Sequence, residues 1–342
     1  MKKFKTVVAG LAFAACLSSS LQAAESTPQF RCKPGETYYM NVMVTGVEYW
    51  FPVYEMFKQA AHQFGCKTVY GGTPAYDVNQ QLASFEQILA QKPAGIFLHP
   101  MNPDPFIEPI NRAAEMGIPV VTFAADSPNS KRVAYITSDN YREGKAAADE
   151  LGKAMGKGAE FAVLENPGQD NHDRRVSSFI AEMKTAFPDS KLVARAATNQ
   201  DPSKAYNAVL SMLQANPNLK GIFMPEASSA IGAAQAVIEN GGKVKVMTVD
   251  VNAKVLDMIK SGQVFGAINP NQGIQGYMGF ITLFLAAHPE LIDPMNDAKR
   301  SGVNPFSFPI LDNGYAVVTK DNADDFRWDA YLKRRGTKGI NE

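Results

Sequence analysis

Short apolar runs alternate with helical patterns along nearly the whole chain. The runs are rich in β-branched and aromatic residues, which is typical of strands buried on both faces of a sheet. Between them, apolar residues recur every three or four positions, as in amphipathic helices. This alternation predicts an α/β fold with parallel, doubly wound sheets. The predicted strands are residues 38–44, 67–70, 94–100, 118–123, 160–165, 191–197, 220–225 and 244–250, and the predicted helices include 52–64, 78–91, 141–155 and 203–217.

The pattern divides into two similar halves. Gly95-Ile96-Phe97 and Gly221-Ile222-Phe223 each belong to a strand run, and each is followed by a proline, a helix and another strand. Two copies of one α/β unit predict two Rossmann-like lobes whose crevices face each other. In open α/β sheets, ligands bind beyond the carboxyl ends of the strands. We therefore expect binding residues in the loops that follow the strands.

The first residues have the layout of a secretory signal peptide. Three lysines precede an apolar run at 7–16, and small residues follow up to Ala23, near which we expect cleavage. The run is too short to span a bilayer. Lipid attachment at Cys16 is the weaker alternative, because Phe13 stands where lipoprotein signals usually carry an aliphatic residue. The mature chain is therefore expected to be exported to the periplasm as a soluble protein.

Charge and length limit the classes of function. The 342 residues include 34 basic and 34 acidic side chains, and removing the leader takes three lysines, which leaves 31 against 34, a net charge of about −3. That balance argues against a nucleic acid or an anionic membrane as partner. About 320 mature residues exceed one comfortable core and predict two domains.

Two cysteines follow the leader. Cys32 lies shortly before the first predicted strand and Cys66 at the start of the second, so a parallel sheet places both at the same end. An oxidising compartment and this placement favour a disulfide over two free thiols. In the chain-entropy account, such a bridge contributes about 3 to 4 kcal/mol.

Aromatic and acidic residues follow strands in the first half. Glu48, Tyr49 and Trp50 come just before a helix, where polar-edged aromatics beside an acid suit the face and the hydroxyls of a flat ligand. Packing against the helix start as a hydrophobic staple is the alternative. Asp126 follows the fourth predicted strand, with an ordinary turn before Ser127 as the alternative.

The second half places charged and amide residues at equivalent positions. Arg174 and Arg175 lie near the start of a helix, where the helix dipole disfavours cations. A guanidinium offers paired donors to neighbouring oxygens, so one arginine is expected to reach the ligand and the other solvent. Glu226 and Asp250 each follow a strand. Segment 266–277, rich in amides and glycines, is interpreted as a loop that adds amide contacts ahead of an apolar helix.

The sequence lacks the motifs of the enzymes that use such folds. The first strand–helix turn has a single glycine instead of a dinucleotide fingerprint, and no phosphate loop, HExxH helix or GxSxG turn is present. His62 and His288 are interpreted as surface or packing residues, whereas His99 and His172 lie near strand or helix ends, within reach of a ligand. We predict a binding protein with no enzymatic activity, no cofactor and no metal.

The chain carries, in order, the segments EYWFPVYEMFKQAA, GIFLHPMNPD, IPVVTFAAD, AYITSDN, NHDRRVSSF, VMTVD and NPNQGIQGY. Together with the leader, they resemble periplasmic sugar-binding proteins of the ribose-binding type, the receptors of ABC importers. The resemblance implies two lobes joined by a three-strand hinge that close on a monosaccharide or polyol. It also implies a monomer that delivers its ligand to an ABC transporter permease in the inner membrane.

The resemblance assigns roles to residues. Tyr49 and Trp50 match the family's stacking aromatics, Arg175 matches its ligand-clamping arginine, and Asp250 matches an aspartate that takes two hydroxyls. Gln200 and Glu226 match further contact positions, and one of Asn269, Asn271 and Gln272 matches a hinge-side amide. The predicted contact set is Glu48, Tyr49, Trp50, Asp126, Arg175, Gln200, Glu226, Asp250, Asn271 and Gln272.

One position departs from the family pattern. Many sugar binders have an aspartate followed by an arginine or another polar residue where this chain has Ala124 and Ala125. Either Asp126 takes that place, or the ligand offers fewer hydroxyls there. The Arg175→Ala variant is expected to bind at least about tenfold more weakly, with little change in the melting temperature of the free protein.

The resemblance also sets the predicted domain limits. The N-terminal lobe is expected to comprise 24–139 plus about 270–305, and the C-terminal lobe 140–269 plus about 306–342. The three hinge crossings are expected at 138–140, near Asn269 and at 305–309. Two other functions remain alternatives: a periplasmic receptor that presents its ligand to a chemotaxis or sensor protein, and an exported carbohydrate-active enzyme.

Overall fold

The computed structural model describes residues 30–291 and 310–336, and the predicted leader and its cleavage site lie outside this part. Two six-stranded sheets form within it. The first has the order β11-β5-β4-β3-β1-β2 and the second β12-β10-β9-β8-β6-β7. The first sheet contains β1 (Thr37–Val42), β2 (Lys67–Gly72), β3 (Gly95–Leu98), β4 (Val120–Phe123), β5 (Ala134–Thr137) and β11 (Leu311–Asp312). The second contains β6 (Glu160–Glu165), β7 (Lys191–Ala197), β8 (Leu219–Phe223), β9 (Lys245–Val249), β10 (Gly266–Pro270) and β12 (Tyr315–Val318).

The two sheets repeat one topology, which confirms the predicted doubly wound α/β fold. The order β5-β4-β3-β1-β2 in the first sheet corresponds strand for strand to β10-β9-β8-β6-β7 in the second. These pairs are parallel, and β12 joins β10 as an antiparallel edge strand. In such an order, strands are added on one side of the first strand and then on its other side. The point where the order reverses is the topological switch point, and ligands of open α/β sheets bind there.

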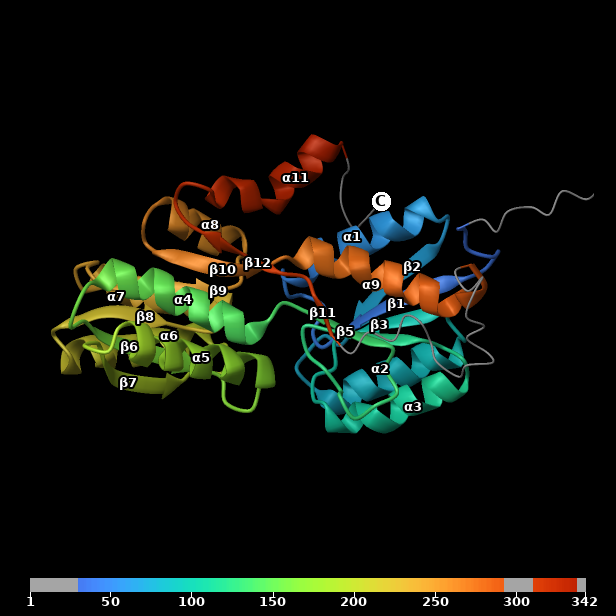
Figure 1. Cartoon of the computed structure of the whole chain (residues 1–342), viewed down its shortest axis with the longest axis horizontal. Coiled ribbons are helices and arrows are strands. Elements are labelled where there is room, and N and C mark those ends of the chain that lie inside the picture. Colours follow the sequence, from blue (N-terminus) through green and yellow to red (C-terminus); the bar gives the residue numbers. More distant parts are fainter. Residues whose placement is uncertain (1–29, 292–309, 337–342) are drawn as a thin grey trace, which may run out of the picture. The chain divides into compact units, whose positions relative to one another are not determined.

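Helices cover both faces of the first sheet because its strands are apolar on both faces (Figure 1). On one face, Phe97 packs against α1 (Trp50–Gln63) and α9 (Gln272–Ala287). On the other, Ile96 and Leu98 pack against α2 (Val78–Ala90) and α3 (Ile107–Glu115). Successive side chains of a strand point to opposite faces of the sheet, so neighbouring residues of β3 pack in two different hydrophobic cores.

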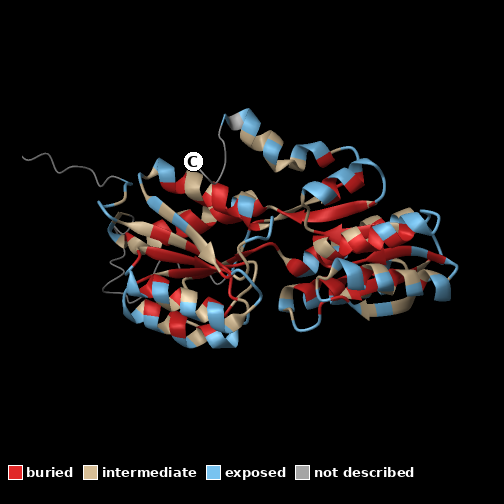
Figure 2. Cartoon of the chain, turned by 180° about the vertical axis from the view of Figure 1, so that it is seen from behind, coloured by how far each residue is buried: buried red, intermediate tan, exposed pale blue. Residues whose placement is uncertain are grey.

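The second sheet is covered in the same way. Val163 packs on the side of α4 (Asn140–Met155) and α5 (Asp170–Ala186). Ala162 and Leu164 pack on the side of α6 (Pro202–Ala215), α7 (Ala227–Glu239) and α8 (Ala253–Lys260). Figure 2 shows buried residues filling the strands and the inward helix faces, with exposed residues on the outward faces.

The sequence pattern misses four of the described strands, namely β5, β10, β11 and β12. Segment 266–270 was interpreted as a loop, but β10 pairs with β9 and β12 there, and Ala267 and Ile268 are fully buried. A glycine, an asparagine and a proline within five residues hid the strand, because these residues are depleted in strands. β5, β11 and β12 are two to four residues long and do not belong to a longer apolar run of the kind that marks the predicted strands.

The chain passes between the sheets at three places. The first passage lies between β5 and α4 at Ser138 and Asp139, and the second at Asn271, both near the expected positions. The expected third crossing at 305–309 lies outside the described residues. β11 belongs to the first sheet and β12 to the second, so a passage lies at Asn313 and Gly314, later than the predicted limit near 306. The lobe limits as a whole stay a prediction.

No helix within residues 30–291 and 310–336 combines the length and the apolar character that a membrane crossing requires.

The predicted disulfide is present. Cys32 and Cys66 are bonded, their Cα atoms lie 5.2 Å apart, and they are separated by 34 residues along the chain. Cys32 N also donates to Phe64 O at 2.9 Å. The bridge therefore fixes the segment before β1 to the start of β2.

The Cys66→Ser variant is expected to lose about 3 to 4 kcal/mol of unfolding free energy, because the unfolded chain regains the entropy of the opened loop. Urea unfolding under non-reducing conditions, with a metal chelator present, measures this loss. Wild-type protein treated with a reductant serves as the control and should unfold at the same urea concentration as the variant. Equal stability of oxidised wild type and variant would contradict the expectation.

Candidate functional site

A cavity of about 580 Å³ is lined by residues that follow strands of both sheets. Loops after β1 and β3 contribute from the first sheet, and loops after β6 and β8 from the second, so the cavity lies at both topological switch points. Seven of the ten predicted contact residues line it. They are Tyr49, Trp50, Asp126, Arg175, Gln200, Glu226 and Asp250.

Trp50 lies at the start of α1 and joins the cavity to the core. Its indole Nε1 donates to Val44 O at 2.8 Å, and only 3% of the residue is exposed. Its ring centroid lies 4.6 Å from that of His99 and 5.7 Å from that of Phe123. The two interpretations of Trp50, packing against the helix start and forming a floor for a ligand, are therefore compatible. Its indole packs against the core, and the surface that remains lines the cavity.

Tyr49 stands edge-on to Trp50, with ring centroids 4.9 Å apart. Its hydroxyl donates to Gln275 Oε1 at 3.1 Å. Burial, followed by the charge of Asp250, holds the pKa of Tyr49 well above its usual value. The phenol therefore stays neutral and offers a ring face and a hydroxyl oxygen.

Arg175 is buried and held by an acid that the sequence reading missed. Its Nε donates to Glu143 Oε2 at 2.6 Å, its Nη1 donates to Pro225 O at 3.0 Å, and Nη1 lies 3.8 Å from Asp250 Oδ2. Burial disfavours its charge, but Glu143 and then Asp250 keep its pKa above the usual value. The adjacent Arg174 is exposed, pairs with Asp170 and also lines the cavity.

Close helix packing makes the Glu143–Arg175 pair possible. A Cβ on Gly144 would lie 2.1 Å from Arg175 O, so only glycine lets α4 come this near α5. Ser138 at the first passage donates its hydroxyl to the other oxygen of Glu143. The fully buried Glu143 thus links the passage to the cavity.

Asp250 presents an acceptor that nothing in the described chain uses. Its Oδ1 is buried and has no hydrogen-bond partner among the described residues. Burial raises its pKa to about 7, although Arg175 acts in the opposite direction. Its backbone adopts a left-handed conformation with φ of 66°.

Two further cavity residues share this uncommon conformation. Ala124 has φ of 57° and Gln200 has φ of 61°. Each follows a strand, and such conformations cost about 1 to 3 kcal/mol in non-glycine residues. Three left-handed residues lining one cavity are typical of a functional site, where surrounding structure holds the backbone in place.

Asp126 pairs with a second arginine that the sequence reading missed. Arg132 Nη2 donates to Asp126 Oδ2 at 2.7 Å and its Nε donates to the other oxygen. Thr122 and Ser127 N donate to Asp126 Oδ1 at 2.6 and 2.8 Å. Asp126 thus lines the cavity together with an arginine. Many sugar binders have the arginine directly after the aspartate, whereas here Arg132 comes six residues after Asp126.

Glu226 and Gln200 are fixed by their own turns. The Glu226 carboxylate caps α7 by accepting from Ser228 N and Ser229 N, the latter at 3.1 and 3.2 Å. Gln200 N donates to Asn166 Oδ1 at 2.9 Å, and its Nε2 donates to Gln169 Oε1 at 3.1 Å. Both side chains line the cavity, and some of their hydrogen-bonding atoms are already paired within the protein.

Two buried histidines also line the cavity. Burial lowers the pKa of His99 to about 3, and its Nδ1 has no hydrogen-bond partner within the described residues. Burial, then the charge of Arg175, holds the pKa of His172 well below its usual value. Asn166 Nδ2 lies 3.1 Å from His172 Nδ1. Both rings are therefore neutral at neutral pH.

Three predicted contact residues line a second cavity of about 560 Å³ instead. Glu48 accepts from Ala253 N at the start of α8 at 3.2 Å, and Asn271 Nδ2 donates to Asn313 O at 3.1 Å. Gln272 is buried beside them. This cavity is also lined by Trp328 of α11 (Trp328–Arg335). Glu48 comes before the start of α1 at Trp50. Its side chain lines this second cavity and not the cavity lined by Tyr49 and Trp50.

Comparisons with known proteins agree with this geometry. An arabinose-binding protein, AraP, from Geobacillus stearothermophilus is 33% identical, and the match covers 86% of this chain and 100% of that chain with a TM-score of 0.78. The D-allose-binding periplasmic protein of Escherichia coli is 29% identical over 235 residues, which are 66% of this chain and 75% of the relative.

A third relative was solved with a sugar. The carbohydrate transporter solute-binding protein from Agrobacterium radiobacter, in complex with D-arabinose, is 28% identical and covers 87% of this chain and 99% of its own, with a TM-score of 0.73. The profile of the periplasmic binding protein domain matches residues 38–288, which include both sheets up to β10. The chain therefore belongs to the periplasmic binding protein family.

Proposed function

We propose that this protein captures a monosaccharide or polyol in the cavity at the strand ends and delivers it to the permease of an ABC importer. The proposal places the mature chain in the periplasm, as a monomer, after removal of the leader near Ala23. Relatives named for D-allose, arabinose and ribose binding support the ligand class.

One observation carries the proposal. Asp250 Oδ1 and His99 Nδ1 are buried, line the same cavity and have no hydrogen-bond partner among the described residues. Buried polar atoms are nearly always paired, so these two atoms are positions that a polar ligand bound in the cavity would pair. A polyhydroxyl ligand fits, because each hydroxyl both donates and accepts.

The charge pattern supports an uncharged ligand. Each arginine of the cavity already faces a carboxylate: Arg132 faces Asp126, Arg174 faces Asp170, and Arg175 faces Glu143 and Asp250. An anionic ligand would have to displace one of these acids. An uncharged sugar can instead form hydrogen bonds to the N–H groups and carboxylate oxygens of these pairs that are not already used, without displacing any acid.

The proposed contacts divide by chemistry. Tyr49 and Trp50 cover the C–H face of the sugar ring, since aromatic rings bury apolar area and keep a polar edge. Arg175 and Asp250 form the hydrogen-bonding pair for neighbouring hydroxyls, and Asp126, Gln200 and Glu226 add positions around the ring. Glu48, Asn271 and Gln272 are left out of this set because they line the second cavity.

The passages between the sheets provide for closure. Asn313 N donates to Thr137 O at 3.2 Å and Asn271 N donates to Gly314 O at 3.2 Å, so the three passages are bonded to one another. Hinges of a few residues absorb domain motion, and a ligand favours the closed form by its differential affinity. The closed form is the one we expect a permease to recognise.

A thermal-shift screen of residues 24–342 tests the proposed function. One pentose, hexose or polyol is expected to raise the melting temperature by several degrees, because a ligand at about one hundred times its Kd stabilises the native state by about 2.7 kcal/mol. Amino acids and a sugar phosphate serve as controls. A shift with amino acids but with no carbohydrate would contradict the proposal.

The affinity for the sugar is expected to fall as pH falls below 7. A protonated Asp250 no longer accepts two hydroxyl hydrogens, so the apparent Kd rises about tenfold per pH unit below its pKa. Asp250→Asn should bind weakly with a flat pH profile in isothermal titration calorimetry. The exposed Asp189→Asn is the matched control and should keep the wild-type profile; a flat wild-type profile would contradict the role of Asp250.

The same group sets a stability profile of opposite sign. Its folded pKa is raised from 3.8 to about 7, so its stabilising contribution is complete below pH 3.8 and is lost as pH rises through 7. At pH 8 and without ligand, Asp250→Asn is therefore expected to melt above the wild type, while the two should differ less at pH 5.

The Arg175→Ala variant is expected to lose both affinity and stability. Binding should weaken about tenfold or more, as for a lost charged hydrogen bond. The sequence-based expectation of an unchanged melting temperature is revised, because Glu143 would remain buried without its cation, which costs about 3 to 5 kcal/mol. Urea unfolding without ligand measures the loss.

The neighbouring arginine provides the matched control. Arg174 is exposed and pairs with Asp170 at 2.9 Å, so Arg174→Ala should change the unfolding free energy by less than about 1 kcal/mol. Equal effects of the two substitutions would show that the buried pair does not organise this lobe.

A further inference from the structure

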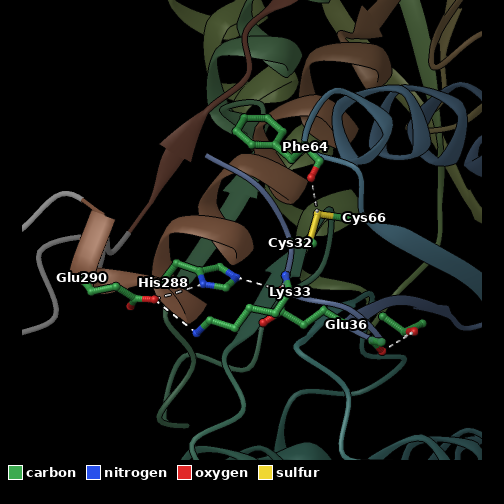
Figure 3. Close-up of a disulfide and its surroundings, with 9 residues drawn as sticks. Cys32, Lys33, Glu36, Phe64, Cys66, His288 and Glu290 are labelled. Atoms are coloured by element: carbon green, nitrogen blue, oxygen red, sulfur yellow. Dashed lines mark hydrogen bonds and ion pairs between the residues drawn. A yellow bond between two sulfur atoms is a disulfide. The ribbon is translucent and has the colours of Figure 1, made fainter. Parts of the chain in front are cut away.

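Three metal-binding side chains lie together at the amino ends of the strands of the first sheet, away from the sugar cavity. Cys32 and Glu36 precede β1, and His288 ends α9. One ligand atom from each of the three lies within 4.8 Å of the others. Figure 3 shows these side chains beside the disulfide, with Glu290 and Lys33 next to the imidazole.

We propose that reduction of the Cys32–Cys66 disulfide converts this cluster into a zinc site. The protein ligands are the Cys32 thiolate, a carboxylate oxygen of Glu36 and Nε2 of His288. Sulfur, nitrogen and oxygen donors of these types are the usual ligands of Zn²⁺. The site is separate from the sugar site and does not depend on the proposed transport function.

The distances fit a tetrahedral metal with little movement. His288 Nε2 lies 3.1 Å from Glu36 Oε2. Ligand atoms about 2.0 to 2.3 Å from one zinc stand roughly 3 to 4 Å from each other. The nitrogen and the oxygen therefore already have the spacing of two ligands, and the sulfur of Cys32 lies within 4.8 Å of both.

The imidazole is oriented as zinc-binding histidines are. Its Nδ1 faces Glu290 Oε1 at 3.4 Å, its ring packs 4.6 Å from the Phe284 ring, and its side chain is 2% exposed. Nε2 lies 3.1 Å from Glu36 Oε2, so a metal at Nε2 would take the place of this contact and would leave the Glu290 carboxylate on the far nitrogen, an arrangement common to zinc-binding histidines. Lys33 lies 3.3 Å from Glu290 and compensates its charge.

The disulfide decides whether the third ligand exists. With Cys32 bonded to Cys66, no thiolate is available, and one histidine with one carboxylate makes a poor zinc site. A dithiol reductant transfers two electrons to the disulfide, releases both cysteine thiols and is itself oxidised to a disulfide. Zinc then displaces the proton of Cys32, and water or the Cys66 thiolate takes the fourth position.

Zinc would replace one cross-link by another. The disulfide ties the segment before β1 to β2, whereas the metal would tie that segment to the end of α9. Zinc is therefore expected to raise the melting temperature of the reduced protein by several degrees and to leave that of the oxidised protein unchanged.

The Cys66→Ser variant tests the site without a reductant, because it leaves Cys32 as a free thiol beside Glu36 and His288. The chelator-stripped variant is titrated with Co²⁺, which gives a thiolate-to-metal charge-transfer band in the near ultraviolet. One Co²⁺ per chain is expected to produce the band, and Zn²⁺ is expected to abolish it by displacement. Oxidised wild type should give no band.

Matched variants in the Cys66→Ser background identify the ligands. His288→Gln and Glu36→Gln should each remove the band or weaken zinc binding at least about a hundredfold, and Glu290→Gln should weaken it about tenfold. The exposed His62→Gln, on the same lobe, is the matched control and should bind as its parent does.

Wild type reduced by a phosphine is the second preparation, and circular dichroism checks that each is folded. The proposal is overturned if folded, reduced protein gives no band, or if the band survives His288→Gln. It is also overturned if reduced protein that has lost its fold does not recover it with zinc, since a metal that stabilises this site should restore it.

Discussion

The buried charge of Arg175 is the constraint on which the second lobe depends. A guanidinium removed from water needs acids and acceptors in fixed places, and here Glu143, Asp250 and Pro225 O supply them. Gly144 is required because Glu143 reaches Arg175 only where α4 and α5 nearly touch. One buried cation thus accounts for the close contact of α4 with α5 and for the acids Glu143 and Asp250 placed around it.

The same network connects the cavity to the first passage between the sheets. Ser138 donates to Glu143, and Glu143 holds Arg175, so three residues join the passage to the proposed sugar contact. On the other lobe, Gln275 accepts from Tyr49 and donates to Ile136 O, next to the same passage. A ligand that engages Tyr49 and Arg175 would therefore act on groups bonded to both sides of one hinge strand. The coupling between the cavity and the first passage therefore runs through direct hydrogen bonds, and no chain of more distant residues is required.

The fold could be predicted from the sequence because buried parallel strands leave continuous apolar runs, and eight such runs were visible. β10 could not be predicted because its own residues include a glycine, an asparagine and a proline, and it is held as a strand by pairing with β9 and β12. The cavity could be predicted from the rule that ligands bind at strand ends. Glu143 and Arg132 could not, because a partner 32 residues away or on a later turn leaves no local signal. Glu48 lines the second cavity, and which cavity a residue of the turn before α1 faces could not be predicted from the sequence.

The two edges of the first sheet serve opposite needs. At the carboxyl edge, Ala124 adopts a left-handed backbone, and Nδ1 of the buried His99 has no hydrogen-bond partner among the described residues. At the amino edge, Cys32 and Cys66 form a covalent bridge, and His288 is held between two acids. Strain at a binding edge has to be offset elsewhere in the domain, and a cross-link at the far edge does so without restricting the loops that close on the ligand. The disulfide therefore stabilises the first lobe at a distance from the residues proposed to bind the sugar.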